Sequence, residues 1–416
     1  PATAEGAVWA KESVKAGESS EPFLFSGWTH RFGWVKNEGK QPVIFTFEID
    51  EAGKNEWKTL KSVIVNAGKS VSVPFASTEK GEWIRVKTDK NTLATVSFNY
   101  TTADPRSTSS DPIYQGLTTV KQNTTIGGLL YGLGDNRRAL GVLANVTVDG
   151  KTSETGYYEM GDKLELVRKE DTKTTDFIRS KFAIPQQVVS IEEGSVLIVD
   201  DLNRRWRLPL GNETYKELTN QGVLRVCREV ATERDMFSCM GTFYELPAEN
   251  ADGYAKIRPI STHNYRINDY ASYRGMLVLT GVTPEEGKEN PHIIVSDDGK
   301  AAVWVGVIDD LWTLGKPVGH GGPWKDTNVK AGVASDPYLI GFYDKKELSL
   351  SHQSDKKVVI TVEVDPTGNG DWMEYAAYAV QPGERFVQQL PEAFQARWIR
   401  FVSDTDTKAT AWLDYK

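Results

Sequence analysis

Short runs in which apolar and polar residues alternate follow one another along almost the whole chain. Near the start, residues 41–50 and 57–65 form two such runs, and Gly53 lies in the segment between them. Runs of about six to nine residues between clusters of Gly, Pro, Asn and Asp are typical of antiparallel hairpins. Further runs are 127–132, 139–148, 154–160, 163–167, 187–191, 195–200, 204–209, 223–230, 236–246, 273–281, 292–296, 301–308, 358–365 and 372–380. Only 170–182 and 250–256 favour a short helix, so the pattern predicts an all-β protein.

The two ends of the chain repeat each other. Residues 6–100 match residues 321–415 without a gap, so each residue of the first copy has its counterpart 315 positions later. The match keeps residue types that seldom coincide by chance: Trp9 and Trp324, Gly17 and Gly332, Pro22 and Pro337, Trp57 and Trp372, Trp83 and Trp398, Tyr100 and Tyr415. A register held over this length indicates an internal duplication.

Strands spaced this regularly predict either a β-propeller or a set of β-sandwiches. We expect a single β-propeller over residues 1–416, because closing a ring brings the first and last blades together and would explain related sequence at the two ends. At about 55–60 residues per blade, the length gives about seven blades. The alternative is a pair of terminal β-sandwich modules that flank a central β domain. The stretch 101–112, rich in Pro, Ser and Thr, would be one linker of such a chain, and no equivalent stretch precedes Gly321.

Composition narrows the class of partner. The 416 residues carry a formal net charge of −8, with a pI of about 5.4. Proteins that bind nucleic acid concentrate cations, so no nucleic-acid partner is expected. No apolar run reaches the roughly 18–20 residues of a membrane span. The 12 Trp and 16 Tyr supply rings of the kind on which sugars stack, although strands and cores also favour them. We expect an oligo- or polysaccharide as partner.

Two features bear on the cellular compartment. The chain opens at Pro1 without a Met, and we expect a processed protein that is secreted, periplasmic or at the cell surface, its signal peptide removed. Cys227 and Cys239 flank a turn-like segment, where a cross-strand disulfide and two buried free thiols are both open. The oligomeric state is left open.

The turns at residues 50–57 and 365–372 resemble the Asp-box, the Ser-x-Asp-x-Gly-x-Thr-Trp turn of sialidase-like propellers. Asp, Gly and Trp are present in both copies, but two extra residues precede the Trp and the leading Ser is absent. More broadly, residues 131–138, 241–247 and 309–317 are similar to secreted bacterial propellers found alongside polysaccharide-degrading enzymes. The resemblance implies that Asp50 and Asp365 close their turns. It also implies carbohydrate-active chemistry, since some propellers of that group are glycoside hydrolases or uronate lyases.

The densest polar segment is 258–274, which holds one His, three Tyr, three Arg and one Asp. Arg binds a carboxylate through two hydrogen bonds, and His shuttles protons near neutral pH. A Tyr beside a cation can have its pKa lowered and act as acid or base. We expect His263, Tyr265, Arg266 and Glu245 as catalytic residues, and Arg258, Tyr270, Tyr273 and Arg274 as substrate-binding residues. The alternative is a loop held by structural hydrogen bonds.

Other residues complete the candidate set. His320, in a Gly-rich loop beside Trp324, and Trp312 join the substrate-binding residues. Further carboxylate candidates are Glu229, Glu233, Asp135, Asp269 and Asp310, the last of which equally suits a turn or cap. Neither His nor Cys has zinc-like spacing, and no nucleotide-binding loop is present. We expect no metal and no cofactor, with structural calcium left open.

These features favour a carbohydrate-active enzyme that cleaves a glycosidic bond in a complex or acidic polysaccharide. A glycoside hydrolase is preferred, and a polysaccharide lyase acting on uronic-acid linkages comes second. The alternative is a non-catalytic carbohydrate-binding or scaffolding protein of the cell surface, whose ring platforms, such as Trp28 and Trp34, would lie apart from any proton-transfer group. The fold does not decide, because propellers host both kinds of function.

Overall fold

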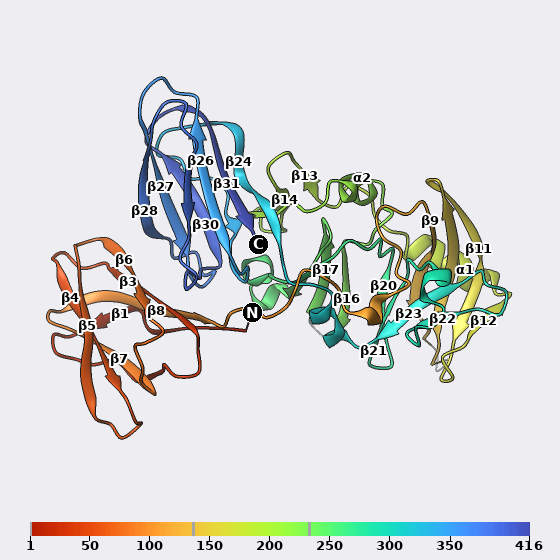
Figure 1. Ribbon diagram of the computed structural model, residues 1–416, viewed down its shortest axis with the longest axis horizontal. Coiled ribbons are helices and arrows are strands. Elements are labelled where there is room, and N and C mark those ends of the chain that lie inside the picture. The colour runs from red at the N-terminus through yellow and green to blue at the C-terminus, as the bar shows by residue number, and fades with distance from the viewer. Residues whose placement is uncertain (1, 135–137, 232–233) are drawn as a thin grey trace. The chain divides into compact units, whose positions relative to one another are not determined.

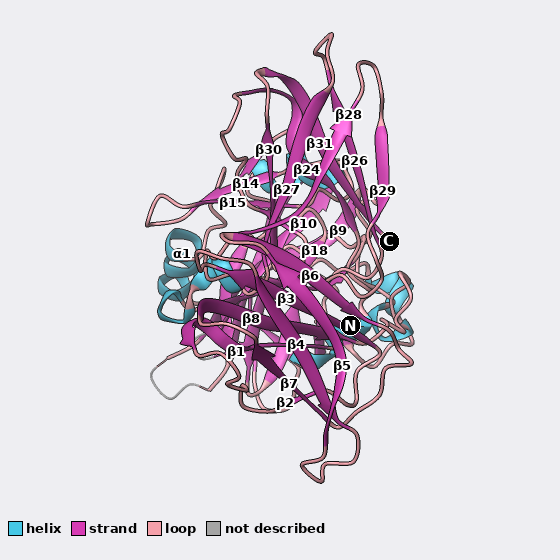
Figure 2. Ribbon diagram, turned by 90° about the vertical axis from the view of Figure 1, so that its left-hand side faces the viewer, coloured by secondary structure: helices cyan, strands magenta, loops and turns pink. Residues whose placement is uncertain are grey.

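Strands make up about half of the computed structural model, which describes residues 2–134, 138–231 and 234–416 (Figure 1). The helices are few and short, as the cyan ribbons of Figure 2 show. The expected all-β class is confirmed. By its internal contacts the chain divides into two compact units. The first unit contains Pro1–Pro105, Glu192–Pro209 and His320–Lys416, and the second contains Arg106–Ile191 and Leu210–Gly319.

The N-terminal copy of the repeat folds into two four-stranded antiparallel sheets, which we call the N-terminal sandwich. Its strands are β1 (Thr3–Val14), β2 (Phe23–Leu24), β3 (His30–Asn37), β4 (Val43–Asp50), β5 (Trp57–Val65), β6 (Lys69–Phe75), β7 (Trp83–Thr88) and β8 (Thr92–Thr101). One sheet has the order β1-β8-β3-β6, and the other has the order β2-β7-β4-β5. Eight strands in these orders form a jelly roll, in which strands far apart in the chain become neighbours.

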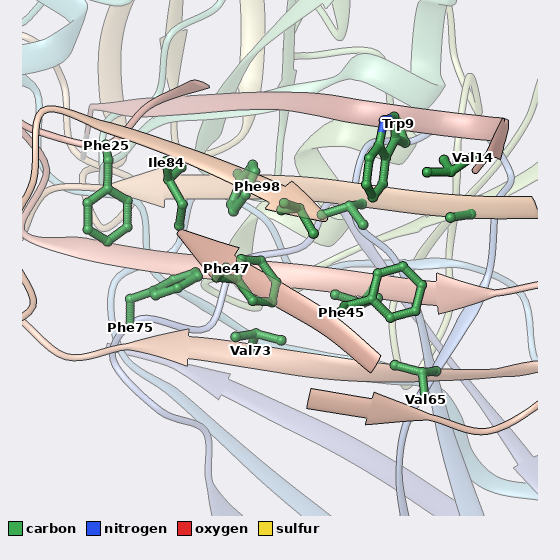
Figure 3. Packing of buried hydrophobic residues seen from close by; sticks show 14 of the residues in the cluster. Trp9, Val14, Phe25, Phe45, Phe47, Val65, Val73, Phe75, Ile84 and Phe98 are labelled. Carbon is green, nitrogen blue, oxygen red and sulfur yellow. The ribbon is translucent and has the colours of Figure 1, made fainter. Parts of the chain in front are cut away.

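Alternation along the strands gives the N-terminal sandwich its core (Figure 3). On β4, Val43, Phe45 and Phe47 are fully buried, whereas Ile44 between them is 37% exposed. Rings from the other sheet close on them: Phe47 lies edge-on to Phe75 of β6, with 5.6 Å between ring centroids. Burying one such side chain contributes roughly 1.5–3 kcal/mol. Because each sheet supplies one apolar face, this copy of the repeat encloses a core of its own.

The C-terminal copy folds in the same way, and we call it the C-terminal sandwich. Its strands are β24 (Gly319–Val329), β25 (Tyr338–Leu339), β26 (Lys346–His352), β27 (Val358–Asp365), β28 (Met373–Val380), β29 (Phe386–Gln389), β30 (Trp398–Ser403) and β31 (Thr407–Tyr415). The orders β24-β31-β26-β29 and β25-β30-β27-β28 repeat those of the N-terminal sandwich strand for strand.

Side chains that differ between the copies keep equivalent contacts. Asn37 at the end of β3 donates a hydrogen bond from Nδ2 to the carbonyl of Val65, at 2.9 Å. Its counterpart His352 places Nε2 at 2.9 Å from the carbonyl of Val380, the counterpart of Val65. A carbonyl only accepts, so this imidazole carries its proton on Nε2. The shared backbone therefore fixes the contact while the residue type changes.

A hairpin distinguishes the C-terminal sandwich from its counterpart. Within the first unit, strands β14 (Val196–Val199) and β15 (Arg205–Leu208) extend one sheet to β14-β15-β25-β30-β27-β28, with β15 parallel to β25. In the N-terminal sandwich the sheet ends at β2 within the described part of the chain.

The second unit contains three four-stranded sheets, with the orders β12-β11-β10-β9, β16-β17-β18-β19 and β20-β21-β23-β22. The strands are β9 (Thr124–Gly132), β10 (Leu140–Val148), β11 (Lys151–Met160), β12 (Leu166–Lys169), β16 (Cys227–Ala231), β17 (Arg234–Cys239), β18 (Thr242–Pro247), β19 (Arg258–Thr262), β20 (Tyr270–Tyr273), β21 (Met276–Leu279), β22 (Ile293–Val295) and β23 (Ala302–Gly306). The two-residue strand β13 (Ser190–Ile191) ends the first segment of this unit. The sheet of β20–β23 packs on both others: Leu277 shares a core with Phe243, and Val278 shares a core with Leu130.

Helices are confined to the second unit in the described residues. They are α1 (Thr172–Lys181), α2 (Thr214–Asn220) and the 3-10 turns η1 (Pro112–Tyr114), η2 (Glu249–Ala251), η3 (Gly253–Lys256), η4 (Pro284–Gly287) and η5 (Ile308–Thr313). The helix expected at 170–182 is α1, and Asp171 caps it by accepting the Thr174 N–H at 3.0 Å. No helix among the described residues combines the length and apolar character that a bilayer crossing requires.

The expected single propeller of about seven blades over residues 1–416 is not found. The sheets of the described residues close no ring, and the two terminal copies are sandwiches rather than blades. The physical reason is the size of the repeat. A four-stranded blade leaves an apolar face that a neighbouring blade must cover, whereas each copy has eight strands and covers its own face. The architecture matches the alternative, with terminal sandwich modules before and after a central β region in the sequence.

Candidate functional site

The residues expected to be catalytic lie in the second unit, and His263 is the most enclosed of them. It follows β19 and is 5% exposed, with the rings of Phe243 and Tyr265 at centroid distances of 5.1 and 6.0 Å. Its Nδ1 accepts the backbone N–H of Tyr265 at 3.0 Å, which places the proton on Nε2. Burial lowers the pKa of His263 to about 3. An imidazole that stays neutral throughout the physiological range is poorly matched to proton transfer near pH 7.

Tyr265 and Arg266 are also expected catalytic residues, but in the described part of the chain neither side chain forms a hydrogen bond with the His263 side chain. Tyr265 is half-buried, and Arg266 is 8% exposed. Burial lowers the pKa of Arg266, and within the described residues its guanidinium makes neither a hydrogen bond nor an ion pair. The three are neighbours in sequence, but the structure provides no proton path between their side chains.

Glu245 is held by two arginines on the sheet of β16–β19. Arg258 stands directly opposite Glu245 on the neighbouring strand and donates from Nε at 2.6 Å. Arg234 of β17 donates from Nη1 to the other carboxylate oxygen at 2.8 Å. This is the geometry of a cross-strand ion-pair ladder, in which charge partners stabilise the pairing of three strands.

Asp269 anchors a buried network that joins all three sheets of the second unit. It is fully buried and forms ion pairs with Arg225 and with Arg228, the latter at 3.2 Å. Its Oδ2 also accepts the backbone N–H of Leu130 on β9, at 2.9 Å. A buried carboxylate satisfied in this way has a structural role, because without it the two guanidinium groups would lose their counter-charge and the Leu130 N–H would lose this acceptor.

The expected substrate-binding residues of this unit do not share one surface. Tyr270 is fully buried, and its hydroxyl donates to a backbone carbonyl of β17 at 2.8 Å. Tyr273 donates to the carbonyl of Arg138 at 2.6 Å. Arg274 is exposed in the β20–β21 turn, where its φ is 52°, and Trp312 is 37% exposed in η5. Local sequence density therefore did not produce a spatial cluster.

Other candidates fall elsewhere or outside the described residues. His320 belongs to the first unit and stacks on Trp412, with centroids 5.7 Å apart, rather than on the Trp that follows it in sequence. Asp310 accepts the backbone N–H of Val307 at 2.8 Å and so acts as a cap. Asp135 and Glu233 lie outside the described residues.

The two cysteines are free thiols. Cys227 pairs with Phe237 across β16 and β17, so Cys239 does not face it and the expected alternative of a disulfide is not formed. Burial raises the pKa of both thiols to about 12. Throughout residues 2–134, 138–231 and 234–416, no three side chains of His, Cys, Asp or Glu gather as a metal ion requires.

A surface hollow on the N-terminal sandwich is the strongest binding candidate. It has a volume of about 370 Å³ and is lined by Pro22, Asp50, Gly53, Asn55, Trp57 and Trp83. Pro22 directly precedes β2, and the others come from the end of β4, the β4–β5 turn and the starts of β5 and β7, which meet at one end of the same sheet. Trp83 is 38% exposed and Trp57 is half-buried, so both indoles are accessible.

The turn between β4 and β5 fixes the floor of the hollow. The carboxylate of Asp50 accepts the backbone N–H groups of Lys54 at 3.1 Å and Asn55 at 2.6 Å. Burial alone would raise the pKa of Asp50, but these hydrogen bonds outweigh it and hold the pKa below its ordinary value. Asn55 in turn accepts the indole N–H of Trp57 at 2.6 Å. Asp365 holds its own turn in the same way, which is the role that the Asp-box resemblance implied.

Charge also positions Trp57. The guanidinium of Arg85 lies 4.3 Å from the centre of its ring, and Glu48 holds that guanidinium by accepting from Nε at 2.8 Å. A cation placed over an indole face is attracted to the ring by roughly 0.5–1 kcal/mol at exposed sites. The same pair recurs in the C-terminal sandwich, where Arg400 lies 4.2 Å from the ring centre of Trp372.

Sequence reasoning noticed the turn and the repeated Trp residues but did not join them into a site. The signal that could have revealed the site is that both copies of the repeat carry the same two tryptophans, at the positions of Trp57 and Trp83. The proposed platforms were Trp28 and Trp34 instead. Trp34 is fully buried and donates its indole N–H to the carbonyl of Gln395 at 3.1 Å, so it is part of the core.

Comparisons with known proteins identify no family for this chain. No family description matches it, and no curated protein does. Among solved structures, likenesses include the subject of "Bacillus endospore appendages form a novel family of disulfide-linked pili", at 13% identity and a TM-score of 0.18, covering 24% of this chain and 89% of that one. The PBSX exported protein XepA matches at 8% identity and a TM-score of 0.19, covering 99% and 86% of the two chains. A glycoside hydrolase of family 32 from Bifidobacterium adolescentis matches at 7% identity and a TM-score of 0.15, covering 94% and 98%. Likenesses this weak assign neither fold nor function.

Proposed function

We propose that the protein binds carbohydrate without cleaving it, through the hollow of the N-terminal sandwich. The observation that carries the proposal is the pair of accessible indoles, Trp57 and Trp83, on one surface. A pyranose presents C–H groups on its faces and hydroxyls around its edge, so an aromatic ring with polar groups beside it complements both. Asn55 and the backbone of the β4–β5 turn supply those polar groups.

The size and charge of the site favour a particular kind of sugar. A volume of about 370 Å³ falls in the lower part of the range of small-molecule sites, which suits a short stretch of a polysaccharide rather than a large ligand. The net charge of −8 opposes the approach of polyanions, so neutral polysaccharides are the preferred ligands. Such a ligand is consistent with a location outside the cytoplasm.

Binding is proposed rather than hydrolysis or elimination because the expected proton-transfer groups are enclosed or paired. His263 is neutral and buried, and Glu245 is held by two arginines. Hydrolysis by a pair of carboxyl groups needs two of them at roughly 5–9.5 Å across the bond. The hollow is lined by one carboxyl group, that of Asp50, whose oxygens accept the N–H groups of its own turn.

Retention on affinity gels that contain neutral or acidic polysaccharides tests the proposal, with calorimetry on those that bind. Trp57→Ala and Trp83→Ala should each weaken binding roughly tenfold or more, the effect of about 1.4 kcal/mol. Trp372→Ala is the matched control, because it removes the equivalent ring of the C-terminal sandwich and should leave binding unchanged. Thermal unfolding of each variant checks that the fold is kept.

Three outcomes contradict the proposal. One is the absence of retention by every polysaccharide. Another is an equal loss of binding in Trp57→Ala and Trp372→Ala. The third is the release of new reducing ends or of unsaturated uronate products, which would show an enzyme.

A further inference from the structure

The two sandwiches differ at one edge, although their strands are otherwise equivalent. In the C-terminal sandwich, Arg207 of β15 pairs with Tyr338 of β25 in a parallel arrangement. The backbone N–H of Arg207 donates to the carbonyl of Pro337 at 2.9 Å. The counterparts of Pro337 and Tyr338 are Pro22 and Phe23, where β2 has β7 as its one strand neighbour in the described chain. The same backbone edge is therefore paired in one copy and unpaired in the other.

The apolar surface beside this edge shows the same contrast. Trp206 of β15 packs against Trp398, with 4.7 Å between the ring centroids. Trp398 and Leu339 are fully buried. Their counterparts in the N-terminal sandwich, Trp83 and Leu24, are 38% and 45% exposed. The N-terminal sandwich thus keeps the ring and the leucine that a docked strand covers, but has nothing over them in the described chain.

Charge completes the correspondence. Asp336 binds the hairpin by accepting from Nε of Arg205 at 3.0 Å and from Nε of Arg207 at 2.7 Å. Its counterpart is Glu21, which is also acidic and is exposed. Within the described residues Glu21 takes part in no ion pair. The N-terminal edge therefore retains a carboxylate at the position where the C-terminal edge recognises arginine.

We propose that the N-terminal sandwich accepts a β-strand from a partner protein along the β2 edge, which we define as Glu21, Pro22, Phe23, Leu24 and Trp83. The strand runs parallel to β2 and donates a backbone N–H to the carbonyl of Pro22. It carries an aromatic residue whose ring lies over Trp83. The residues directly before and after that aromatic residue are basic, and their side chains reach Glu21. Backbone pairing supplies affinity in this mode of recognition, and the side-chain contacts supply specificity.

The shortness of β2 does not argue against docking. A very short edge strand is one of the devices by which proteins discourage unwanted pairing. However, β25 has the same two-residue length as β2 and is nevertheless paired with β15. What permits pairing at β25 is the combination of ring contact and arginine–carboxylate contacts, and the β2 edge presents both receiving groups.

The partner is a different protein rather than a second copy of this chain. The sequence Arg205-Trp206-Arg207 occurs once in the chain, and it is already bound to the C-terminal sandwich. The proposal goes beyond carbohydrate binding and does not depend on it, because it uses the backbone of β2. The two proposed binding sites share Trp83. A docked aromatic ring would cover Trp83 and close the hollow, in the way that Trp206 covers Trp398 in the C-terminal sandwich.

A cyclised peptide of residues 192–209 is the probe, titrated into the full chain by calorimetry. Saturable binding of one peptide per chain is expected. Glu21→Arg and Trp83→Ala in the chain should each weaken peptide binding about tenfold or more. A peptide that carries Trp206→Ala should bind the unchanged chain more weakly by at least the same factor. Glu12→Arg on the far sheet is the matched charge control and should leave binding unchanged. Trp57→Ala should also leave peptide binding unchanged while it weakens sugar binding, so the two proposals fail separately.

Hydrogen exchange on the unmodified chain gives a second measurement that needs no variant. Added peptide should slow the exchange of the segment that contains Phe23 and Leu24. Lack of saturable binding overturns the proposal, as does binding that Glu21→Arg and Trp83→Ala leave unchanged, which would place the peptide at another surface. Self-association of the chain that Glu21→Arg abolishes would also overturn it, because the occupant would then be a second copy.

Discussion

Replacing Trp206 by Ala should loosen the hairpin β14–β15 from the C-terminal sandwich. The ring of Trp206 packs against Trp398 at 4.7 Å between centroids, its N–H donates to Asp200 at 2.9 Å, and the residue is 9% exposed. Roughly 150 Å² of ring area at about 25 cal/mol per Å² is worth about 4 kcal/mol, and the hydrogen bond adds about 1 kcal/mol. We therefore expect hairpin docking to weaken by about 3–5 kcal/mol, the range for buried Trp-to-Ala changes.

Hydrogen exchange measures this local loss directly. The backbone N–H of Arg207, which donates to the carbonyl of Pro337, should exchange about two to three and a half orders of magnitude faster in Trp206→Ala, since each 1.4 kcal/mol is about tenfold. Trp83→Ala is the control: this ring is 38% exposed and no further strand packs on it within the described residues, so the loss of stability should be clearly smaller than in Trp206→Ala. Unchanged exchange at Arg207, or an equal loss of stability in the two variants, would refute the contrast between the edges on which the docking proposal depends.

Other expected outcomes concern the second unit. The unfolded chain protonates His263 near pH 6.5 whereas the folded chain does so only near pH 3, so the free energy of unfolding should fall as pH falls through this window. His263→Asn should flatten that slope by up to about 1.4 kcal/mol per pH unit in urea titrations, and an unchanged slope would count against burial of the ring. Asp269→Asn should destabilise the fold by about 3–5 kcal/mol because its two arginine partners lose their counter-charge, and a loss below about 1 kcal/mol in thermal or urea unfolding would contradict this. A thiol reagent should label Cys227 and Cys239 slowly until urea unfolds the chain, because the pKa of each is raised to about 12; rapid labelling of the native protein would show that they are accessible.

The local elements were largely encoded in the sequence. The alternating run at 57–65 is β5, the run at 358–365 is β27, and the segment at 170–182 contains α1. Alternation, β-branched residues and turn residues act over a few neighbours, so they can be recognised without knowing which strands pair. The constant offset of 315 residues is also kept in the structure, since the strands of the two sandwiches begin and end within two residues of equivalent positions.

What only the tertiary structure decided was pairing and burial. The sheet orders of the two sandwiches, such as β2-β7-β4-β5, join strands that are distant in the chain, as β2 and β7 are. Alternation along a single strand says nothing about its neighbours. The polar segment 258–274 suggested a site because the sequence does not show which of its residues strand pairing will bury. Its residues are close in sequence, but pairing places His263 and Asp269 inside, and the paired sheets put Arg274 in an exposed turn.

Tertiary packing also explains why two equivalent tryptophans of the repeat differ in exposure. Trp83 and Trp398 are equivalent in sequence, and the sequence by itself gives them the same surroundings. One is 38% exposed and the other is fully buried, because a hairpin from residues 192–209 packs on the second and the described chain offers nothing equivalent to the first. Sequence thus determined which residues form the two edges. Long-range packing, which depends on a segment far away in the chain, decided that one edge is covered and the other is exposed.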